Sequence, residues 1–296
     1  MTKNFPLAAL QLPIAAMAPL LKKAAKAYVA GSTVEQALSV AQALGPEGAA
    51  NTLAFWDSAC DSPDKVIEMY LQTVRASAAS GLESYISIKA PSFDFDPSRL
   101  YPVLKAAHSH SIKIHFDALA PETVDATFCL IEESLLVHGD IGCTLPGRWS
   151  RSLRDAELAI RLGLTVRVVK GQWGAPDGEE IEPCAGFLNV VRLLAGRARH
   201  VSVATHDPAL ARRALVILKN AGTPCELELL YGFPKQGVLK ATRALKVPVR
   251  FYLPYGHAWL PYALRQAVSK PRILWWLLRD GFMARHQRRN ALCVQR

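Results

Sequence analysis

Charged side chains stand where apolar, strand-like runs of the sequence end. Lys89, Asp117 and Lys170 each occupy such a position. Burying these groups is costly unless they are paired, so we expect Lys89 to form an ion pair with Asp117. A desolvated lysine is also a nucleophile toward carbonyl compounds, so Schiff-base chemistry at Lys89 or Lys170, as in an aldolase-like lyase, is one open alternative.

Two further features could bind anions. Arg167 lies three residues before Lys170, which places their side chains on opposite faces of a strand. An arginine that lines a barrel needs an anion or a flat, electron-rich group beside it. Residues 205–207 lead directly into a helix that begins with Pro208. Backbone N–H groups at such a helix end can bind phosphate, so the segment could hold a phosphorylated ligand.

The elements that must position these residues alternate between strand-like and helix-like segments. Several strand-like runs carry apolar residues on both faces, which is typical of the core of a parallel sheet. Repeated β-then-α units at this spacing predict an α/β fold of the (β/α)8 TIM-barrel type, with its active site at the C-terminal ends of the strands. We expect strands at residues 51–56, 84–89, 112–117, 141–145, 165–170, 201–205, 225–230 and 249–253.

The chain divides into three expected parts. We predict an N-terminal helical arm over residues 1–50, the barrel over residues 51–270 and a basic C-terminal helix or tail over residues 271–296. The alternative fold is an open doubly wound sheet. That fold would need a glycine-rich dinucleotide turn after an early strand, and the sequence contains none.

Capping residues mark several helix starts. Ser62 and Asp207 each precede a proline, so each is predicted to be an N-cap. Ser32 and Ser152 are each followed three residues later by an acidic residue, which fits a capping box. These signals place helices between the predicted strands.

The last predicted strand and the helix after it carry the most specific motif. Residues 250–256 read Arg-Phe-Tyr-Leu-Pro-Tyr-Gly, and residues 259–265 read Trp-Leu-Pro-Tyr-Ala-Leu-Arg. This pattern resembles the proline dehydrogenases, flavin enzymes on a distorted (β/α)8 barrel, whose corresponding segments read approximately RxYxPYGxxWxPYxxRR. The resemblance runs from about Tyr28 to Arg265. Further matches precede the motif in the family's order at residues 87–89, 117–118, 167–171, 204–207 and 226–232.

The resemblance implies an oxidoreductase of proline metabolism. The reaction would be FAD-dependent oxidation of proline or a related cyclic imino acid to the imine, a pyrroline-5-carboxylate-type product, with hydride transfer to flavin N5. By similarity, Lys89 and Arg265 would bind the substrate carboxylate, with Asp117 orienting Lys89. Tyr252 would pack on the substrate ring, and Leu230 would form an apolar wall. Such a clamp positions the reacting carbon.

The resemblance also implies a set of flavin contacts. Arg167 would approach the flavin ring, while Lys170, Gly171, Thr205 and His206 would hold the ribityl and phosphate parts. A nearby cation would stabilise the reduced, anionic flavin. We therefore expect a cationic mouth at the strand ends.

The chain departs from the family pattern at several of these positions. Gln266 replaces the second of two paired arginines, and Ser269 replaces a glutamate. Pro146 stands where the family has a glutamine that contacts flavin, Glu228 replaces another glutamine, and Gln172 follows the strand glycine in place of alanine. Because both the substrate clamp and the flavin shell are altered, a divergent homologue without redox catalysis, acting as a binding or regulatory protein, is a second alternative.

Composition and charge limit the class of protein. The chain has 296 residues, of which 50% are hydrophobic and 20% charged, so it can bury a large core and is not disordered. Its net charge is +10, and residues 272–296 hold six arginines against one acidic residue. We expect no nucleic-acid partner, because no recognition module accompanies this charge.

The basic tail could serve electron transfer at a membrane. The family passes electrons to quinone, and a tail with Trp275 and Trp276 among arginines could make peripheral membrane contact. The alternative is that these tryptophans pack on the barrel. No apolar run reaches the length of a membrane span.

Cysteine usage and the N-terminus bear on location. The six cysteines form no CxxC pair and no cluster with zinc spacing, so we expect reduced thiols and no metal site. Pro6, Pro13 and Pro19 interrupt the apolar N-terminal stretch, which favours an arm packed on the domain over a signal peptide. We therefore expect a cytoplasmic protein, with the inner face of the membrane as its place of peripheral contact.

Overall fold

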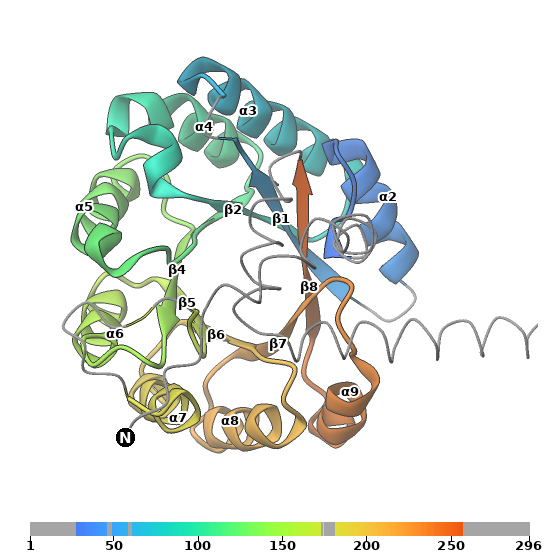
Figure 1. The fold of residues 1–296 in the computed structure, drawn as a ribbon, viewed down its shortest axis with the longest axis vertical. Helices are drawn as coiled ribbons and strands as arrows, with labels where there is room; N and C mark the ends of the chain where they lie inside the picture. Colours follow the sequence, from blue (N-terminus) through green and yellow to red (C-terminus); the bar gives the residue numbers. More distant parts are fainter. Residues whose placement is uncertain (1–27, 46–48, 59–60, 173, 175–180, 257–296) are drawn as a thin grey trace, which may run out of the picture.

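A closed parallel barrel forms the centre of the molecule (Figure 1). The computed structural model describes residues 28–45, 49–58, 61–172, 174 and 181–256. Strand β8 pairs with β1 and closes the sheet, which confirms the predicted (β/α)8 barrel and excludes the open doubly wound sheet. The strands of the described part are β1 (Ala49–Trp56), β2 (Ser84–Ile88), β3 (Lys113–Phe116), β4 (Ile141–Pro146), β5 (Thr165–Val169), β6 (His200–Ala204), β7 (Cys225–Leu230) and β8 (Val249–Gly256).

Helices surround the barrel and cover the outer faces of its strands (Figure 1). Helix α2 precedes β1 and packs against β1, β8 and α3, so the described part of the N-terminal arm is helical and rests on the barrel. The described α-helices are α2 (Val34–Leu44), α3 (Pro63–Ser80), α4 (Pro97–Ser109), α5 (Val124–Leu135), α6 (Ser152–Arg161), α7 (Pro183–Leu194), α8 (Pro208–Asn220) and α9 (Gln236–Thr242). Short 3-10 helices are η4 (Ala90–Phe93), η5 (Pro121–Thr123) and η6 (Arg243–Leu245).

The two faces of the strands differ more than the sequence analysis expected. On β5, Val166 and Val168 are buried in the apolar core, while Arg167 and Val169 line the interior cavity. On β7, Glu226 and Glu228 are buried; Glu226 forms an ion pair with Arg250 of the neighbouring strand β8, and Glu228 forms one with Arg167 of β5, two strands away. Both sides of these strands are therefore buried, as the sequence predicts, but the barrel interior also holds charged and hydroxyl side chains, several of which pair with one another.

Helix caps follow the sequence in two cases and shift by one residue in two others. Ser62 accepts a hydrogen bond from the backbone N–H of Lys65, as predicted. Helix α2 is capped by Thr33 rather than by Ser32. Ser152 is the first residue of α6 rather than its cap, and its hydroxyl donates to the carbonyl of Pro146. Both shifts exchange a residue for its neighbour and leave the helix in place.

The predicted C-terminal helix over residues 271–296, the beginning of the N-terminal arm and Arg265 lie outside the described residues. The domain boundaries therefore stay predictions. Within the described part, every helix is too short or too polar to cross a bilayer. Cys129, Cys143, Cys184 and Cys225 are free thiols.

Candidate active site

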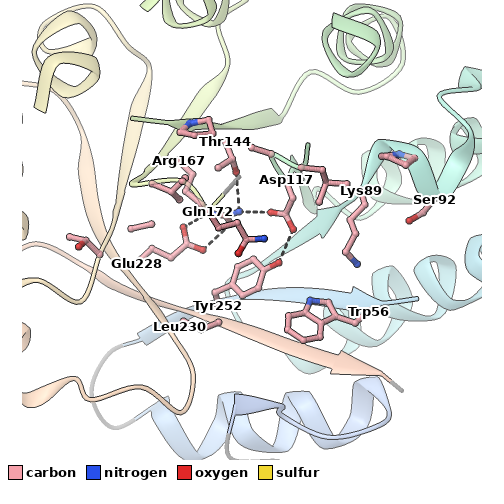
Figure 2. Close-up of a pocket in the computed structure, with 18 of the residues that line it drawn as sticks. Trp56, Lys89, Ser92, Asp117, Thr144, Arg167, Gln172, Glu228, Leu230 and Tyr252 are labelled. Atoms are coloured by element: carbon pink, nitrogen blue, oxygen red, sulfur yellow. Dashed lines mark hydrogen bonds and ion pairs between the residues drawn. The ribbon is translucent and has the colours of Figure 1, made fainter. Parts of the chain in front are cut away.

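A cavity of about 690 Å³ opens at the C-terminal ends of the strands (Figure 2). This is the face of the barrel where active sites lie. The structure brings to this cavity eight of the residues predicted from the sequence: Lys89, Asp117, Arg167, Gly171, Thr205, His206, Leu230 and Tyr252. Lys170 does not line the cavity, and Arg265 lies outside the described residues.

Arg167 forms the floor of the cavity. Its side chain is 4% exposed, and its Nε–H and Nη2–H donate to the two carboxylate oxygens of Glu228 at 2.7 and 2.8 Å. Its Nη1 donates to Asp117 Oδ1 at 2.8 Å and to Thr144 Oγ1 at 3.3 Å. Burial by itself lowers the pKa of Arg167, but Glu228 and Asp117 outweigh this effect, so the net pKa is raised. The guanidinium is therefore a permanent cation held by two anions.

Asp117 connects this floor to Tyr252. The Tyr252 hydroxyl donates to Asp117 Oδ2 at 2.7 Å, and the Ser87 hydroxyl donates to Asp117 Oδ1 at 2.5 Å. Burial and the Asp117 charge raise the pKa of Tyr252 well above its ordinary value. The phenol therefore stays protonated and acts as a donor. The centre of its ring lies 5.1 Å from Cζ of Arg167, so that ring is the flat, electron-rich partner expected for this arginine.

Lys89 is not paired with Asp117, and this prediction was wrong. Its Nζ donates to the carbonyl of Phe55 at 2.5 Å and to Asp57 Oδ1 at 3.1 Å. Ser92 donates to the other oxygen of Asp57 at 2.7 Å. Asp117 is already filled by three donors deeper in the barrel, whereas the longer lysine side chain reaches the carboxyl end of β1. Asp117 consequently does not orient Lys89.

The rim near α8 differs from the phosphate site that the sequence indicated. Lys170 points away from the interior, as predicted from its spacing to Arg167, and its Nζ lies 3.3 Å from Asp207 Oδ2. Asp207 Oδ1 accepts hydrogen bonds from the N–H groups of Ala209 and Leu210 at 3.0 and 3.1 Å. This confirms Asp207 as the N-cap. The described start of α8 therefore already has an anion on these two N–H groups.

His206 is a neutral brace between two loops. The backbone N–H of Leu230 donates to its Nε2 at 3.0 Å, so Nδ1 carries the proton and donates to the carbonyl of Pro234 at 3.0 Å. Burial lowers the pKa of His206, and the bond to Pro234 only partly offsets this. His206 lines the cavity through its ring and adds no charge at neutral pH.

The charged residues that the structure describes in the lining do not make a cationic mouth. The two cations, Lys89 and Arg167, lie beside three carboxylates, those of Asp57, Asp117 and Glu228. The expectation of a cationic mouth was therefore wrong for the described part of the lining. Each cation is already paired with a carboxylate of the protein: Lys89 with Asp57, and Arg167 with Asp117 and Glu228.

Several lining residues were not predicted from the sequence, among them Trp56, Ser92 and Thr144. Gln172, noted in the sequence only as a departure from the family pattern, also lines the cavity, and Figure 2 shows its side chain directed toward the interior. Trp56 stands two residues after Ala54 and four after Thr52 on β1, so strand alternation could have identified it. Gln172 follows the end of β5 in a loop, and no periodic signal marks it.

The lysines of the site do not have the environment of a Schiff-base nucleophile. Lys89 is bound to Asp57 and a backbone carbonyl, and Lys170 is bound to Asp207 and is 37% exposed. A Schiff-base lysine is a desolvated amine that is free to attack a carbonyl carbon, whereas both of these amines are paired with a carboxylate. The described residues also contain no cluster of His, Cys, Asp and Glu that could hold a metal ion. Fold and site together define a (β/α)8-barrel protein whose catalytic face holds a cavity with a largely apolar lining and an ion-paired floor.

Comparison with known proteins narrows this class. The chain is 28% identical over 273 residues to the proline dehydrogenase of Deinococcus radiodurans, covering 84% of this chain and 86% of that protein. It is 22% identical over 264 residues to proline dehydrogenase 1 of Bacillus subtilis, covering 83% and 87%. No protein-family model matches.

Solved structures give the same fold. Proline utilization A from Bdellovibrio bacteriovorus, inactivated by N-propargylglycine, superposes with a TM-score of 0.74 at 16% identity, covering 86% of this chain. Proline utilization A from Bradyrhizobium japonicum gives 0.65 at 16% identity, covering 81%. The matched part is 34% and 30% of those longer chains. The predicted resemblance is confirmed: the chain is a divergent relative of the proline dehydrogenases and, with them, an oxidoreductase.

Proposed function

We propose that the chain oxidises proline or a related cyclic imino acid with FAD as its cofactor. The observation that carries this proposal is the convergence of Lys89, Asp117, Arg167, Leu230 and Tyr252 on one cavity. These residues lie on, or directly after, five different strands. Lys89, Asp117 and Arg167 were predicted from their residue types and positions as well as from the resemblance, and the roles of Leu230 and Tyr252 from the resemblance. The product would be the cyclic imine of the pyrroline-5-carboxylate type.

The cavity fits a flavin in size and in chemistry. Its volume of about 690 Å³ lies within the range of cofactor pockets, roughly 300–1,000 Å³. Pro146, Val169 and Leu230 offer apolar surface for a flat ring, while Thr205 and Gln172 offer hydrogen-bonding groups. Such a mixture suits a heteroaromatic ring with polar edges. When bound, FAD supplies the acceptor for the hydride.

The chain's own residues would hold the cofactor from two sides. Arg167 would approach the ring from the floor, and Gly171, Thr205 and His206 would line its edge. Lys170 would supply the positive charge for the phosphates. Asp207 accepts hydrogen bonds from two N–H groups of α8 and also pairs with Lys170, so Lys170 would exchange this carboxylate for the phosphates when the cofactor binds.

The substrate would lie between Lys89 and Tyr252. The Lys89 ammonium group, fixed by Phe55 and Asp57, would attract the substrate carboxylate, together with Arg265. The Tyr252 hydroxyl is held by Asp117, so its ring is fixed as a wall for the substrate ring. Leu230 would close the apolar side. These contacts would hold the carbon next to nitrogen at the position from which hydride leaves.

A visible spectrum of the purified protein, loaded with FAD and then treated with proline without oxygen, tests this proposal. We expect flavin absorbance that bleaches on addition of proline. The variant Lys89→Met is expected to raise KM for proline by about tenfold or more with a smaller change in kcat, since it removes a binding charge. Lys65→Met is the matched control, because Lys65 forms a similar ion pair with Asp61 on the protein surface.

Failure of this experiment has a distinct meaning. A protein that takes up no FAD on reconstitution, and shows no turnover with any cyclic amino acid, would be the non-catalytic binding or regulatory homologue. FAD uptake without reduction by proline would instead point to a different cyclic imino acid.

We further propose that electrons pass to quinone and that the protein acts in the cytoplasm, with the basic tail in peripheral contact with the membrane. The free thiols of the described cysteines support a reducing compartment. Liposome flotation of the full chain, against a chain truncated before Pro271, tests the membrane contact. Equal flotation of the two would remove it.

A further inference from the structure

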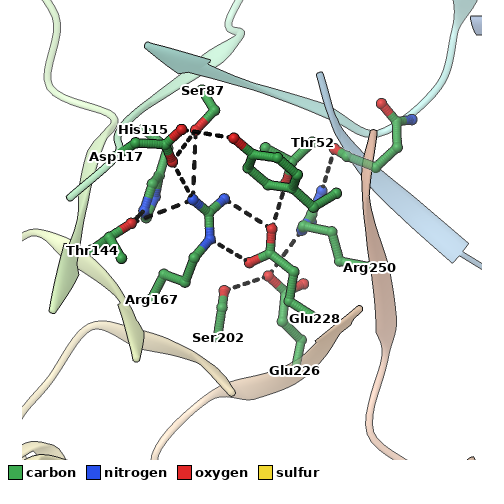
Figure 3. Close-up of polar contacts among 12 residues, drawn as sticks. Thr52, Ser87, His115, Asp117, Thr144, Arg167, Ser202, Glu226, Glu228 and Arg250 are labelled. Carbon is green, nitrogen blue, oxygen red and sulfur yellow. Dashed lines mark hydrogen bonds and ion pairs between the residues drawn. The ribbon is translucent and has the colours of Figure 1, made fainter. Parts of the chain in front are cut away.

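Glu228 is a buried carboxylate whose hydrogen bonds are all directed inside the barrel. It is 3% exposed, and its two oxygens accept from Nε and Nη2 of Arg167 in a parallel pair (Figure 3). Its Oε1 also accepts from the Thr52 hydroxyl at 3.0 Å. Two-point contact of this kind fixes both position and charge. Glu228 therefore holds the guanidinium in one orientation beneath the cavity.

The charge of this floor differs from that of a simple arginine. Arg167 is shared between Glu228 and Asp117, at 2.7 and 2.8 Å, and both carboxylates line the cavity. One cation with two anions leaves the floor negative. In the low dielectric of the barrel this charge acts strongly on any group bound above it.

Resting on the proposed FAD-dependent function, we propose that Glu228 is a positioning residue that sets the charge of the cavity floor and thereby keeps the flavin's reduction potential low. Two-electron reduction adds negative charge to the flavin. A floor that carries Glu228 disfavours this charge, whereas the same floor with a neutral side chain at this position would leave Arg167 and Asp117 balanced. Glu228 orients Arg167 and adds its own charge to the floor, and neither effect requires it to touch the ligand.

A second buried ion pair, formed by another glutamate of β7, lies away from the cavity and provides a comparison for Glu228. Glu226 lies two residues before Glu228 and pairs with Nε of Arg250 at 2.8 Å (Figure 3). Arg250 is fully buried and also donates to the carbonyl of Asn51 at 2.8 Å. Neither Glu226 nor Arg250 lines the cavity. Glu226 is thus a matched control: the same residue type, equally buried, one layer farther from the ligand.

A spectroscopic redox titration of the FAD-loaded protein against a reference dye tests the inference. Glu228→Gln keeps the size of the side chain and removes its charge, and we expect the flavin midpoint potential to rise by about 30 mV. That shift corresponds to a tenfold change in the ratio of affinities for reduced and oxidised flavin in a two-electron couple. Glu228→Asp keeps the charge and is expected to restore the wild-type potential. Glu226→Gln is expected to change it by less than half as much as Glu228→Gln.

Each outcome either supports or overturns the inference. An unchanged or lowered potential in Glu228→Gln overturns it, and so does an equal rise in Glu226→Gln. Should Glu228→Gln fail to fold, Asp117→Asn decides, because it removes the charge of the other carboxylate on Arg167: we expect its midpoint potential to rise as well, and an unchanged or lowered value overturns the inference. A wild-type protein that binds no FAD would instead refute the proposed function, which is a separate result.

Discussion

Removing the guanidinium of Arg167 should show how much its ion pairs contribute to the free energy of unfolding of the barrel. Arg167 and Glu228 are 4% and 3% exposed, so Arg167→Gln leaves a buried carboxylate that has lost two charged donors. Thr52 still donates to Glu228, and Ser87 and Tyr252 still donate to Asp117, so most of the cost falls at Glu228. Breaking a buried pair from one side costs about 3–5 kcal/mol, and we expect a loss of about 4 kcal/mol.

The double variant Arg167→Gln with Glu228→Gln should recover part of this loss. Two amides can hydrogen-bond to each other, and no unpaired charge remains between these positions. We expect the double variant to be more stable than Arg167→Gln alone, with a coupling energy of at least about 2 kcal/mol. Equilibrium urea unfolding of the wild type, both single variants and the double variant gives this value.

A surface arginine provides the control. Arg197 makes a two-point contact with Glu157 at 2.7 and 2.6 Å, which matches the Arg167–Glu228 geometry, but its side chain is 45% exposed. Arg197→Gln is expected to cost much less stability than Arg167→Gln, because solvent screens this exposed pair. If Arg167→Gln costs no more than Arg197→Gln, or if the losses at Arg167 and Glu228 simply add, then the buried network does not stabilise the barrel as argued.

Three further variants test separate parts of the structure. Asp207→Ala should cost about 1 kcal/mol at pH 7 through loss of the α8 cap. The hydrogen bond from the backbone N–H of Leu210 contributes most to lowering the pKa of Asp207 from its ordinary value of 3.8. The stabilisation by this cap is therefore present above pH 3.8 and is lost as the pH falls through the pKa of the folded state. In thermal melts the difference between wild type and variant should therefore be full at pH 7 and become smaller as the pH is lowered below 3.8. Gly186→Ala should prevent folding or cost about 3 kcal/mol or more, because the new Cβ would overlap the carbonyl oxygen of Gly147. Gly139→Ala is the control, because a Cβ at Gly139 would meet open space, and it should leave the melting temperature in circular dichroism unchanged. Tyr252→Phe should cost about 2 kcal/mol in urea unfolding, because Asp117 loses a charge-assisted hydrogen bond, and an unchanged stability would show that this bond is not made in solution.

The order and extent of the strands could be predicted from sequence because each strand is a short apolar run between helix signals. The predicted strand at residues 225–230 matches β7, and the others end within three residues of the observed bounds. The exact N-cap residue was harder to predict. Ser32 and Thr33 are neighbours and both are good N-cap residues, and only the extended backbone conformation at Thr33 identifies it as the cap. That charged residues such as Arg167 and Asp117 lie near one cavity could be predicted from their residue types and their positions in or after strands, because the C-terminal ends of the strands of a parallel barrel meet at one face.

Which of these residues pair was not predictable from the sequence. Lys89 and Asp117 occupy neighbouring positions in register beyond β2 and β3, yet each has a different partner. Asp117 lies where the guanidinium of Arg167, from β5 two strands along the barrel, can reach it. The competition between a nearby lysine and a distant arginine depends on side-chain directions that no spacing along the chain contains.

Local patterns in the chain, apolar periodicity and turn residues, were enough to specify a barrel and to place its reactive side chains at one rim, because both properties depend on short segments. The sign of the charge beneath the cavity could not be obtained in this way. It depends on Glu228, Arg167 and Asp117, which come from three strands and meet only when the sheet closes. A closed barrel brings residues far apart in sequence within hydrogen-bonding distance, and its electrostatics are therefore a property of the assembled fold.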